Sequence, residues 1–172
     1  SISGFVSSNS GSVATSGSTY AVGTYSNTSG GGWSNYTTSS GSNDVASAGN
    51  FPAGTGYQMA SASGGTLAFT GTVATSDQTV AITDNSGSGG TKWNLVANPF
   101  PSYLNGNSNA GANNFFSTNS GVLHSSFQAI YGYDYDSGGS NYTPYNATNT
   151  WFIAPGQAFF VASANASGSS VA

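Results

Sequence analysis

The chain has 172 residues and a formal net charge of −4, yet only 3% of its residues are charged, against about 25% in an average soluble domain. Lys92 is the single Lys or Arg, and this excludes nucleic-acid binding and a basic membrane-binding surface, because one cation cannot neutralise a phosphate backbone. The longest apolar run, near 158–162, is far shorter than the ~20 residues that span a bilayer, so we expect no membrane insertion.

Short apolar or alternating runs, separated by Gly, Ser, Asn and Asp, recur along the whole chain and predict strands. Aromatic residues make up 13% of the chain, enough to build a core with Val, and helical spacing is not evident. We therefore expect one all-β domain over 1–172, in the form of a β-sandwich. The predicted strands are Ser3–Ser8, Ser18–Tyr25, Gly56–Ala62, Thr66–Thr72, Gln78–Thr83, Lys92–Ala97, Ala129–Tyr135 and Gln157–Ser163.

The first predicted strand has two interpretations. It is short, terminal and partly apolar, so Ile2, Phe5 and Val6 are candidates for a donor strand that completes the sheet of a neighbouring subunit. The alternative is an ordinary first strand of the same subunit.

The chain also repeats itself loosely, which predicts an internal duplication of 1–63 and 91–163, with connecting strands in 64–90. Three pairs of segments match in order along the chain at offsets of about a hundred residues. They are Phe5–Asn9 with Leu95–Pro99, Gly23–Thr37 with Gly132–Thr143, and Phe51–Ser61 with Ile153–Ser163. Chance matching in a Ser- and Gly-rich chain is the alternative.

Two segments of the second half carry a family resemblance. They are Trp93-Asn94-Leu95-Val96-Ala97-Asn98-Pro99-Phe100-Pro101-Ser102 and Ile153-Ala154-Pro155-Gly156-Gln157-Ala158-Phe159-Phe160-Val161, with the Tyr-rich 129–133 between them. This pattern resembles a module of secreted Bacteroidota proteins that often precedes a type IX secretion sorting domain. Ala97 and Ala158 stand where that family has Gly. The resemblance implies an exported all-β module and no particular reaction.

Candidates for catalysis and metal binding are few. His124 is the only His, Cys and Glu are absent, and a zinc site or a catalytic triad is therefore not expected. Asp134 and Asp136, in a Gly-containing turn, faintly suggest calcium, although the EF-hand spacing and its final Glu are missing and a hairpin turn explains the same residues. We expect a non-catalytic protein with no cofactor.

Aromatic residues near predicted turns are candidates for stacking on sugar rings, namely Trp33, Tyr36, Tyr142, Tyr145 and Trp151. The alternative is that these rings form the core, because few other large apolar side chains are available. Possible glycosylation sequons begin at Asn27, Asn35, Asn146 and Asn165, and in an Asn- and Ser-rich chain such sequons also arise by chance.

Sparse charge weakens the repulsion that keeps most domains apart, so the surface is either covered or made to self-associate. We therefore expect a secreted, extracellular or cell-surface structural protein, either a filament subunit or an adhesin module whose partner is another copy of itself. The alternative function is a carbohydrate-binding module of a larger secreted protein, with glycans as partners.

Overall fold

A computed structural model of the chain describes residues 1–134 and 141–172. The first part of the chain forms α1 (Ile2–Ser8), β1 (Thr15–Ser16), β2 (Thr19–Ser26), β3 (Gly32–Thr37), the 3-10 helix η1 (Val45–Ser47), β4 (Gln58–Met59), β5 (Val80–Ile82) and the 3-10 helix η2 (Ser86–Ser88). The remainder forms β6 (Trp93–Ala97), β7 (Leu104–Asn105), α2 (Phe115–Asn119), the 3-10 helix η3 (Ser125–Phe127), β8 (Ile130–Asp134), β9 (Asn141–Tyr145), β10 (Phe152–Ile153), β11 (Ala158–Ala162) and β12 (Ser169–Val171).

The strands form antiparallel sheets, and the prediction of an all-β fold is confirmed. One sheet has the order β1-β2-β3, with β4 also paired to β2, and a second has the order β6-β11-β8-β9. Two smaller sheets pair β10 with β7 and β12 with β5. The finer prediction of a β-sandwich stays a prediction.

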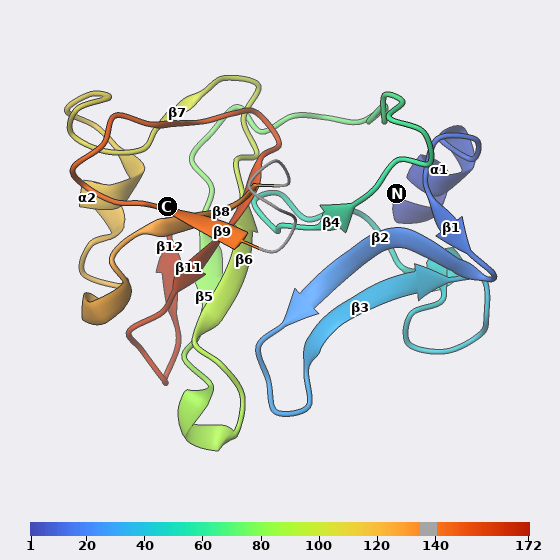
Figure 1. Ribbon diagram of the computed structural model, residues 1–172, viewed down its shortest axis with the longest axis horizontal. Coiled ribbons are helices and arrows are strands. Elements are labelled where there is room, and N and C mark those ends of the chain that lie inside the picture. Colours follow the sequence, from blue (N-terminus) through green and yellow to red (C-terminus); the bar gives the residue numbers. More distant parts are fainter. Residues whose placement is uncertain (135–140) are drawn as a thin grey trace.

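Strand β6 connects the two larger sheets. On one edge it pairs with β11 over its whole length, from Trp93 opposite Ala162 to Ala97 opposite Ala158. On its other edge it meets the segment before β4: Gly56 N donates to Leu95 O at 3.2 Å, and Ala97 N donates to Gly54 O at 2.7 Å. Strand β6 therefore lies between β11 and the segment that leads into β4 of the first sheet (Figure 1).

Two clusters of buried apolar side chains form the core. The cluster under the first sheet is built on Phe5, Val6, Val13 and Val22. The cluster of the second sheet is larger: it consists of Ile82, Val96, Phe115, Leu123, Ile130, Trp151, Ile153, Phe159, Val161 and Val171. Figure 1 shows α1 at one end of the long axis of the molecule and α2 at the other.

The N-terminal segment is a helix, so the strand predicted over Ser3–Ser8 is wrong. Ser1 caps the helix, accepting from Gly4 N at 3.1 Å, and Ile2, Phe5 and Val6 share one helical face that is buried in the core of their own subunit. The donor-strand interpretation of Ile2, Phe5 and Val6 is wrong for the same reason. Their i, i+3, i+4 spacing is that of a helix.

Most of the other predicted strands are confirmed in position, in β2, β4, β5, β6, β8 and β11. The strand predicted over Thr66–Thr72 is wrong, because this segment has no regular structure. Strands β3 and β9 were missed. Both pair along their length with the preceding strand, β2 or β8, and the Gly and Asn of β3 and the Asn and Pro of β9 weaken their strand signal.

Two buried asparagines make the same contacts in the two halves of the chain, and we call each arrangement an asparagine clamp. Asn9 Nδ2 donates to Phe5 O at 2.8 Å and Ala68 O at 2.9 Å, and its Oδ1 accepts from Ala68 N at 2.8 Å. Asn119 binds Phe115 O, Ala172 O and Ala172 N in the same way, at 2.8, 3.0 and 2.9 Å. Each clamp fastens the end of a helix to a segment more than fifty residues later in the chain.

A second pair of matching contacts, two isolated β-bridges, accompanies the clamps in the two halves of the chain. Val13 bridges Ser61, and Leu123 bridges Ser163, both antiparallel. The matched contacts span 5–68 in one half and 115–172 in the other. The predicted match of Phe5–Asn9 with Leu95–Pro99 is wrong, because the first segment is helical and the second lies mainly in β6. The duplication itself, with its predicted limits 1–63 and 91–163, stays a prediction. Phe115–Asn119 is the structural counterpart of Phe5–Asn9.

Candidate functional site

An aromatic cleft lies between the β2–β3 hairpin and the second sheet. Six aromatic side chains from six different strands line a hollow of about 380 Å³, and we call this hollow the aromatic cleft. Its lining residues are Tyr25 on β2, Trp33 on β3, Trp93 on β6, Tyr131 on β8, Tyr142 on β9 and Phe160 on β11. A volume of this size is in the range of small-ligand sites, which is roughly 300–1,000 Å³.

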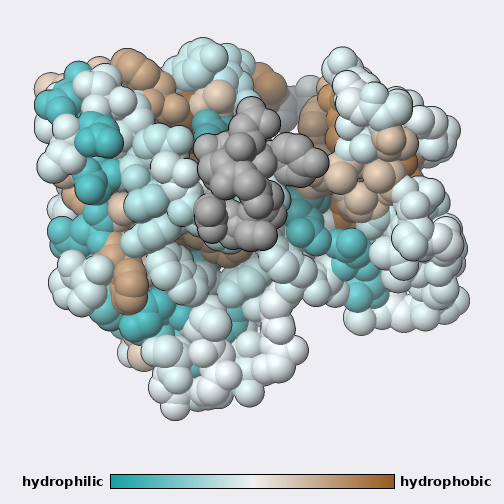
Figure 2. Space-filling view, viewed as in Figure 1, coloured by the Kyte–Doolittle hydropathy of each residue, from teal (hydrophilic) through white to brown (hydrophobic). Residues whose placement is uncertain are grey.

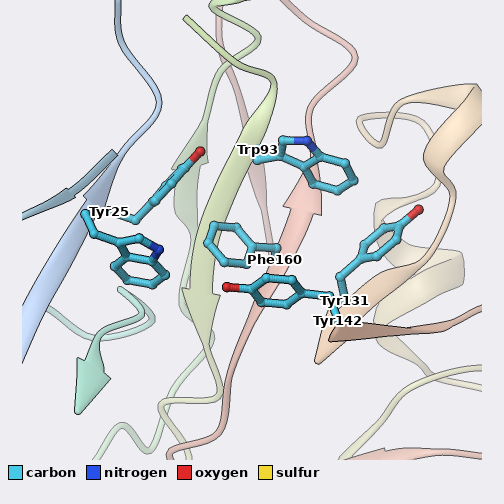
Figure 3. Close-up of a pocket in the computed structure, with 6 residues that line it drawn as sticks. Tyr25, Trp93, Tyr131, Tyr142 and Phe160 are labelled. Atoms are coloured by element: carbon cyan, nitrogen blue, oxygen red, sulfur yellow. The ribbon is translucent and has the colours of Figure 1, made fainter. Parts of the chain in front are cut away.

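Phe160 is the centre of the cleft. Figure 3 shows its ring in the middle, with Tyr25 on one side and with Trp93 and Tyr131 on the other. The ring centroid of Phe160 lies 4.8 Å from that of Tyr25 and 5.3 Å from that of Tyr142, with the rings nearly perpendicular. These edge-to-face contacts fix the rings in place and leave aromatic faces for a ligand.

The rim of the cleft is exposed, whereas its floor is not. Trp33 keeps 43% of its surface accessible and Tyr142 keeps 41%, while Phe160 keeps only 7%. Large exposed rings above a buried aromatic floor are costly to leave in water unless a partner covers them. The rim is therefore the part of the cleft best suited to contact a ligand.

Among the residues that the structure describes, the lining of the cleft carries no group that is ionised at neutral pH. Burial raises the pKa of the Tyr131 hydroxyl, and burial, with the nearby Tyr133 and Tyr25, also raises that of Tyr142. Both hydroxyls therefore stay protonated and can donate as well as accept hydrogen bonds. The cleft combines apolar ring faces with neutral hydroxyl groups.

The single Lys of the chain is engaged outside the lining. Lys92 Nζ lies 3.8 Å from Asp84 Oδ2 and 3.1 Å from His124 Nε2. Hydrogen bonds from Ser86 and, to a lesser extent, the charges of Lys92 and His124 lower the pKa of Asp84. An anionic ligand in the cleft would find this cation already paired.

A second hollow of about 500 Å³ continues the cleft and shares Trp33, Tyr131, Tyr142 and Phe160 with it. It adds the side chains of Tyr57, Gln58, Met59, Leu95, Tyr133, Ala158 and Phe159. Gln58 Nε2 donates to Asn35 Oδ1 at 2.6 Å. A ligand longer than one ring could therefore extend from the cleft across β4.

A network of amides holds the β2–β3 hairpin, which carries Tyr25 and Trp33, against the second sheet. Asn27 Nδ2 donates to Thr83 O at 2.7 Å and to Asn94 Oδ1 at 3.2 Å, and Asn27 Oδ1 accepts from Asn85 at 2.8 Å. The hydroxyls of Tyr25 and Thr91 add a hydrogen bond of 3.2 Å. The hairpin therefore keeps a defined distance from β6, and the cleft stays open between them.

Of the predicted stacking residues, the structure brings Trp33 and Tyr142 together in the cleft and places the others in the two cores. Tyr36 packs against the first cluster, and Tyr145 packs against the second. Trp151 is 6% exposed, and its Nε1 donates to Asn146 O at 2.8 Å. The prediction is therefore wrong for Trp151, because its ring fills the core.

Sequence reasoning missed Tyr25, Trp93, Tyr131 and Phe160 as cleft residues. They lie within or next to predicted strands, and alternation assigns each side chain to a face of its strand. Alternation does not show that these particular faces meet across two sheets. The close spacing of aromatic residues at 131, 133 and 142 is the one local signal that could have drawn attention to this region.

The predicted glycosylation sites differ in their exposure and in whether their side-chain amides hold other parts of the chain by hydrogen bonds. The Asn27 amide nitrogen already donates two hydrogen bonds, and Asn35 is half-buried with its Oδ1 bonded to Gln58. Asn146 and Asn165 are exposed on loops. A glycan on Asn27 would cost the hydrogen bonds that hold the hairpin, so Asn146 and Asn165 are the better placed acceptors.

The calcium candidate cannot be placed in the structure: Asp136 lies outside the described residues, and of Asp134 only the backbone, in β8, is described. Within residues 1–134 and 141–172, no group of three or more His, Asp or Glu side chains could hold a metal ion. In the same part of the chain, no helix is long and apolar enough to cross a membrane.

Comparison with family models, with curated proteins and with solved structures found no match to this chain. The class of site therefore rests on the geometry alone: an aromatic-lined cleft, uncharged among the described residues, on an all-β scaffold.

Proposed function

We propose that this protein is a non-catalytic binding module whose aromatic cleft binds an uncharged saccharide. The observation that supports the proposal is the convergence of six aromatic side chains from six strands on one open hollow. The faces of pyranose rings carry C–H groups that pack on aromatic faces, and sugar hydroxyls can pair with neutral tyrosine hydroxyls.

The charge distribution favours a neutral ligand over an anionic one. The six lining side chains are uncharged, and the only Lys of the chain is paired with Asp84. A nucleotide or a sulfated sugar would lose hydration of its anionic groups without gaining a cation in return. The sparse charge of the whole chain agrees with a module that works outside the cell, at a cell surface or in a secreted protein.

Binding of soluble neutral polysaccharides tests the proposal. We expect a panel of β-glucan, α-glucan, mannan and xylan to include at least one ligand, detected by calorimetry and by a change in tryptophan fluorescence. Trp33→Ala should weaken that binding by at least tenfold, about 1.4 kcal/mol, because it removes the largest exposed ring of the rim.

Tyr103→Ala is the matched control, since Tyr103 is 66% exposed and does not line the cleft. It should leave the affinity unchanged. The proposal fails if no polysaccharide of the panel binds, or if Trp33→Ala binds as well as the unaltered chain while both remain folded by circular dichroism.

Self-association is a second candidate function, in which the protein is a subunit of a surface filament or an adhesin that binds copies of itself. Large apolar side chains are exposed outside the cleft, among them Phe69 at 62%, Val73 at 53% and Phe152 at 51%. With 3% charged residues, little electrostatic repulsion opposes contact between copies. Figure 2 shows a face that is mostly pale, of intermediate hydropathy, with small strongly apolar patches toward both ends.

A further inference from the structure

The two hairpins that border the aromatic cleft are built on the same plan. Strand β2 pairs with β3 on one edge and with β4 on the other, and β8 pairs in the same way with β9 and β11. Gly23 of β2 and Tyr131 of β8 hold equivalent positions, because each is paired with a residue of both flanking strands. The two three-stranded units can therefore be aligned from these two residues.

Two residues further along each central strand, a ring pairs with a ring of the neighbouring strand. Tyr25 lies opposite Trp33, with 5.3 Å between the ring centroids and 68° between the ring planes. Tyr133 lies opposite Tyr142, with 5.6 Å and 62°. We call these the Trp33 pair and the Tyr142 pair. The same cross-strand ring pair, in the same register and with nearly the same geometry, thus occurs in both units.

Both pairs contact one buried ring, the floor of the cleft. The ring centroid of Phe160 lies 4.8 Å from that of Tyr25 and 5.8 Å from that of Trp33. It also lies 5.3 Å from that of Tyr142, and Figure 3 shows Tyr25 and Tyr142 reaching the Phe160 ring from different sides. Trp33, Tyr133 and Tyr142 are 43%, 56% and 41% exposed, whereas Phe160 is 7% exposed. Two equivalent and largely exposed ring pairs therefore share one floor.

We propose that the two pairs are subsites for successive sugar units, so that the cleft binds a linear chain of like units rather than a single sugar. This inference rests on the proposed binding of an uncharged saccharide and specifies the form of that saccharide. Two alike sites side by side match a ligand whose units are alike, and a single sugar fills only one of them. Trp33 and Tyr142 also line the hollow of about 500 Å³ that continues the cleft, so a chain has room beyond the two pairs.

Neutral hydrogen-bonding groups accompany the rings. The Tyr142 hydroxyl is protonated at neutral pH, because burial raises its pKa, and the Gln58 side chain lines the hollow that continues the cleft. Such groups both donate and accept hydrogen bonds, as sugar hydroxyls do. Proline-rich peptides also pack on aromatic-lined grooves, but their proline units offer only carbonyl acceptors. The mixture of ring faces, hydroxyls and amide therefore favours a saccharide chain.

A ligand that reaches both pairs gains from each of them. Once one unit is bound to the first pair, contact of the next unit with the second pair becomes intramolecular, and its effective concentration is high. Affinity should therefore rise steeply with chain length until both pairs are occupied, and little after that.

Calorimetry with oligosaccharides of graded length tests the proposal. The probes are cello-, malto-, manno- and xylo-oligosaccharides, from the single sugar to the hexasaccharide. For the sugar that binds, we expect the hexasaccharide to bind about tenfold or more tightly than the single sugar. Trp33→Ala and Tyr142→Ala should each remove this gain, because each variant keeps only one complete pair. A purely structural role of either ring would not alter the dependence on chain length.

Tyr103→Ala is again the matched control and should keep the whole gain, since Tyr103 is 66% exposed and lines neither hollow. Circular dichroism and thermal unfolding show whether each variant is folded. Should Tyr142→Ala unfold because its ring also contacts Phe160, Tyr133→Ala interrupts the same pair from its other side.

The outcomes separate this inference from the function on which it rests. If the single sugar binds as tightly as the hexasaccharide, or if only one of the two pairs affects the gain, saccharide binding stands and the two subsites are wrong. If no oligosaccharide binds, both proposals are wrong. Binding of poly-L-proline, or association between copies that Trp33→Ala abolishes, would then identify the occupant of the cleft as a polypeptide.

Discussion

Gly106 shows how one missing side chain lets a tryptophan enter the core. A Cβ atom on Gly106 would overlap the six-membered ring of Trp151, and Trp151 is 6% exposed in the second cluster. No rotation of a methyl group relieves such an overlap, so the ring or the backbone would have to move.

Gly106→Ala should therefore lower the free energy of unfolding by about 3 kcal/mol or prevent folding. Gly121→Ala is the control, because a Cβ at that position meets nothing within 4 Å, and it should leave stability nearly unchanged. Urea denaturation followed by tryptophan fluorescence measures both. Equal stability of the two variants would show that Trp151 is not packed as described.

Tyr57 gives the protein a dependence on alkaline pH. Burial, with the neighbouring Tyr36, raises the pKa of Tyr57 from the ordinary 10.0 to about 12. The unfolded chain therefore loses this proton at a lower pH than the folded chain does. The stability that protonated Tyr57 contributes should be fully present below about pH 10 and should be lost as pH rises from about 10 to about 12.

Comparing Tyr57→Phe with the unaltered chain isolates this effect from the other tyrosines. At pH 8 the midpoints of thermal unfolding of the two proteins should differ only through packing and hydrogen bonding. Between pH 10 and pH 12 the midpoint of the unaltered chain should fall relative to that of Tyr57→Phe. A difference that stays constant across that range would mean that the Tyr57 hydroxyl is not buried.

At the scale of elements, the asparagine clamps join helices to distant chain segments. Asn119 holds both backbone groups of Ala172, just after β12, while bonding to Phe115 O in α2. The side chain is 3% exposed, so its removal leaves backbone groups without partners in a largely dry site. The same holds for Asn9, α1 and Ala68.

Asn119→Ala and Asn9→Ala should each lower the free energy of unfolding by about 1–3 kcal/mol. Ser120→Ala next to the second clamp is a suitable control, because Ser120 is exposed and its hydroxyl donates within the helix end, to Ser117 O. Chemical denaturation measures all three variants. A clamp variant as stable as Ser120→Ala would contradict the structural role of the amide.

At the scale of the whole molecule, the two clusters of core residues are tied together by β6, by the Asn27 network and by the rings of the cleft. Segment 54–56 and β11 share β6, and Tyr25 and Trp33 of the first sheet contact Phe160 of the second. Loss of either cluster would therefore expose surface of the other. This coupling predicts cooperative unfolding of the whole chain.

Val22→Ala in the first cluster and Ile153→Ala in the second should each lower the midpoint of one common transition, at a cost of about 1–4 kcal/mol. Fluorescence and far-ultraviolet circular dichroism should report the same midpoint for each variant. Two separate transitions, each sensitive to one variant only, would mean that the clusters fold independently.

The composition and the local pattern predicted the all-β class and the positions of β2, β4, β5, β6, β8 and β11. Each of these depends on residues close in sequence or on simple totals. The helix α1 was also encoded locally, in the spacing of Ile2, Phe5 and Val6 behind Ser1, but its seven residues are too few to show the i, i+3, i+4, i+7 pattern. Trp151 was misassigned because a tryptophan near a turn carries the same signal whether it lies in a core or on a rim.

The sequence by itself determined a sparsely charged surface and strands whose side chains alternate between two faces, because charge is additive and the strand period is two residues. Only the tertiary structure decided which of those faces meet. The cleft draws its rings from positions between 25 and 160, and the clamps join residues more than fifty positions apart. Such contacts depend on how β6 and the hairpins pack in space, and no short-range pattern contains that information.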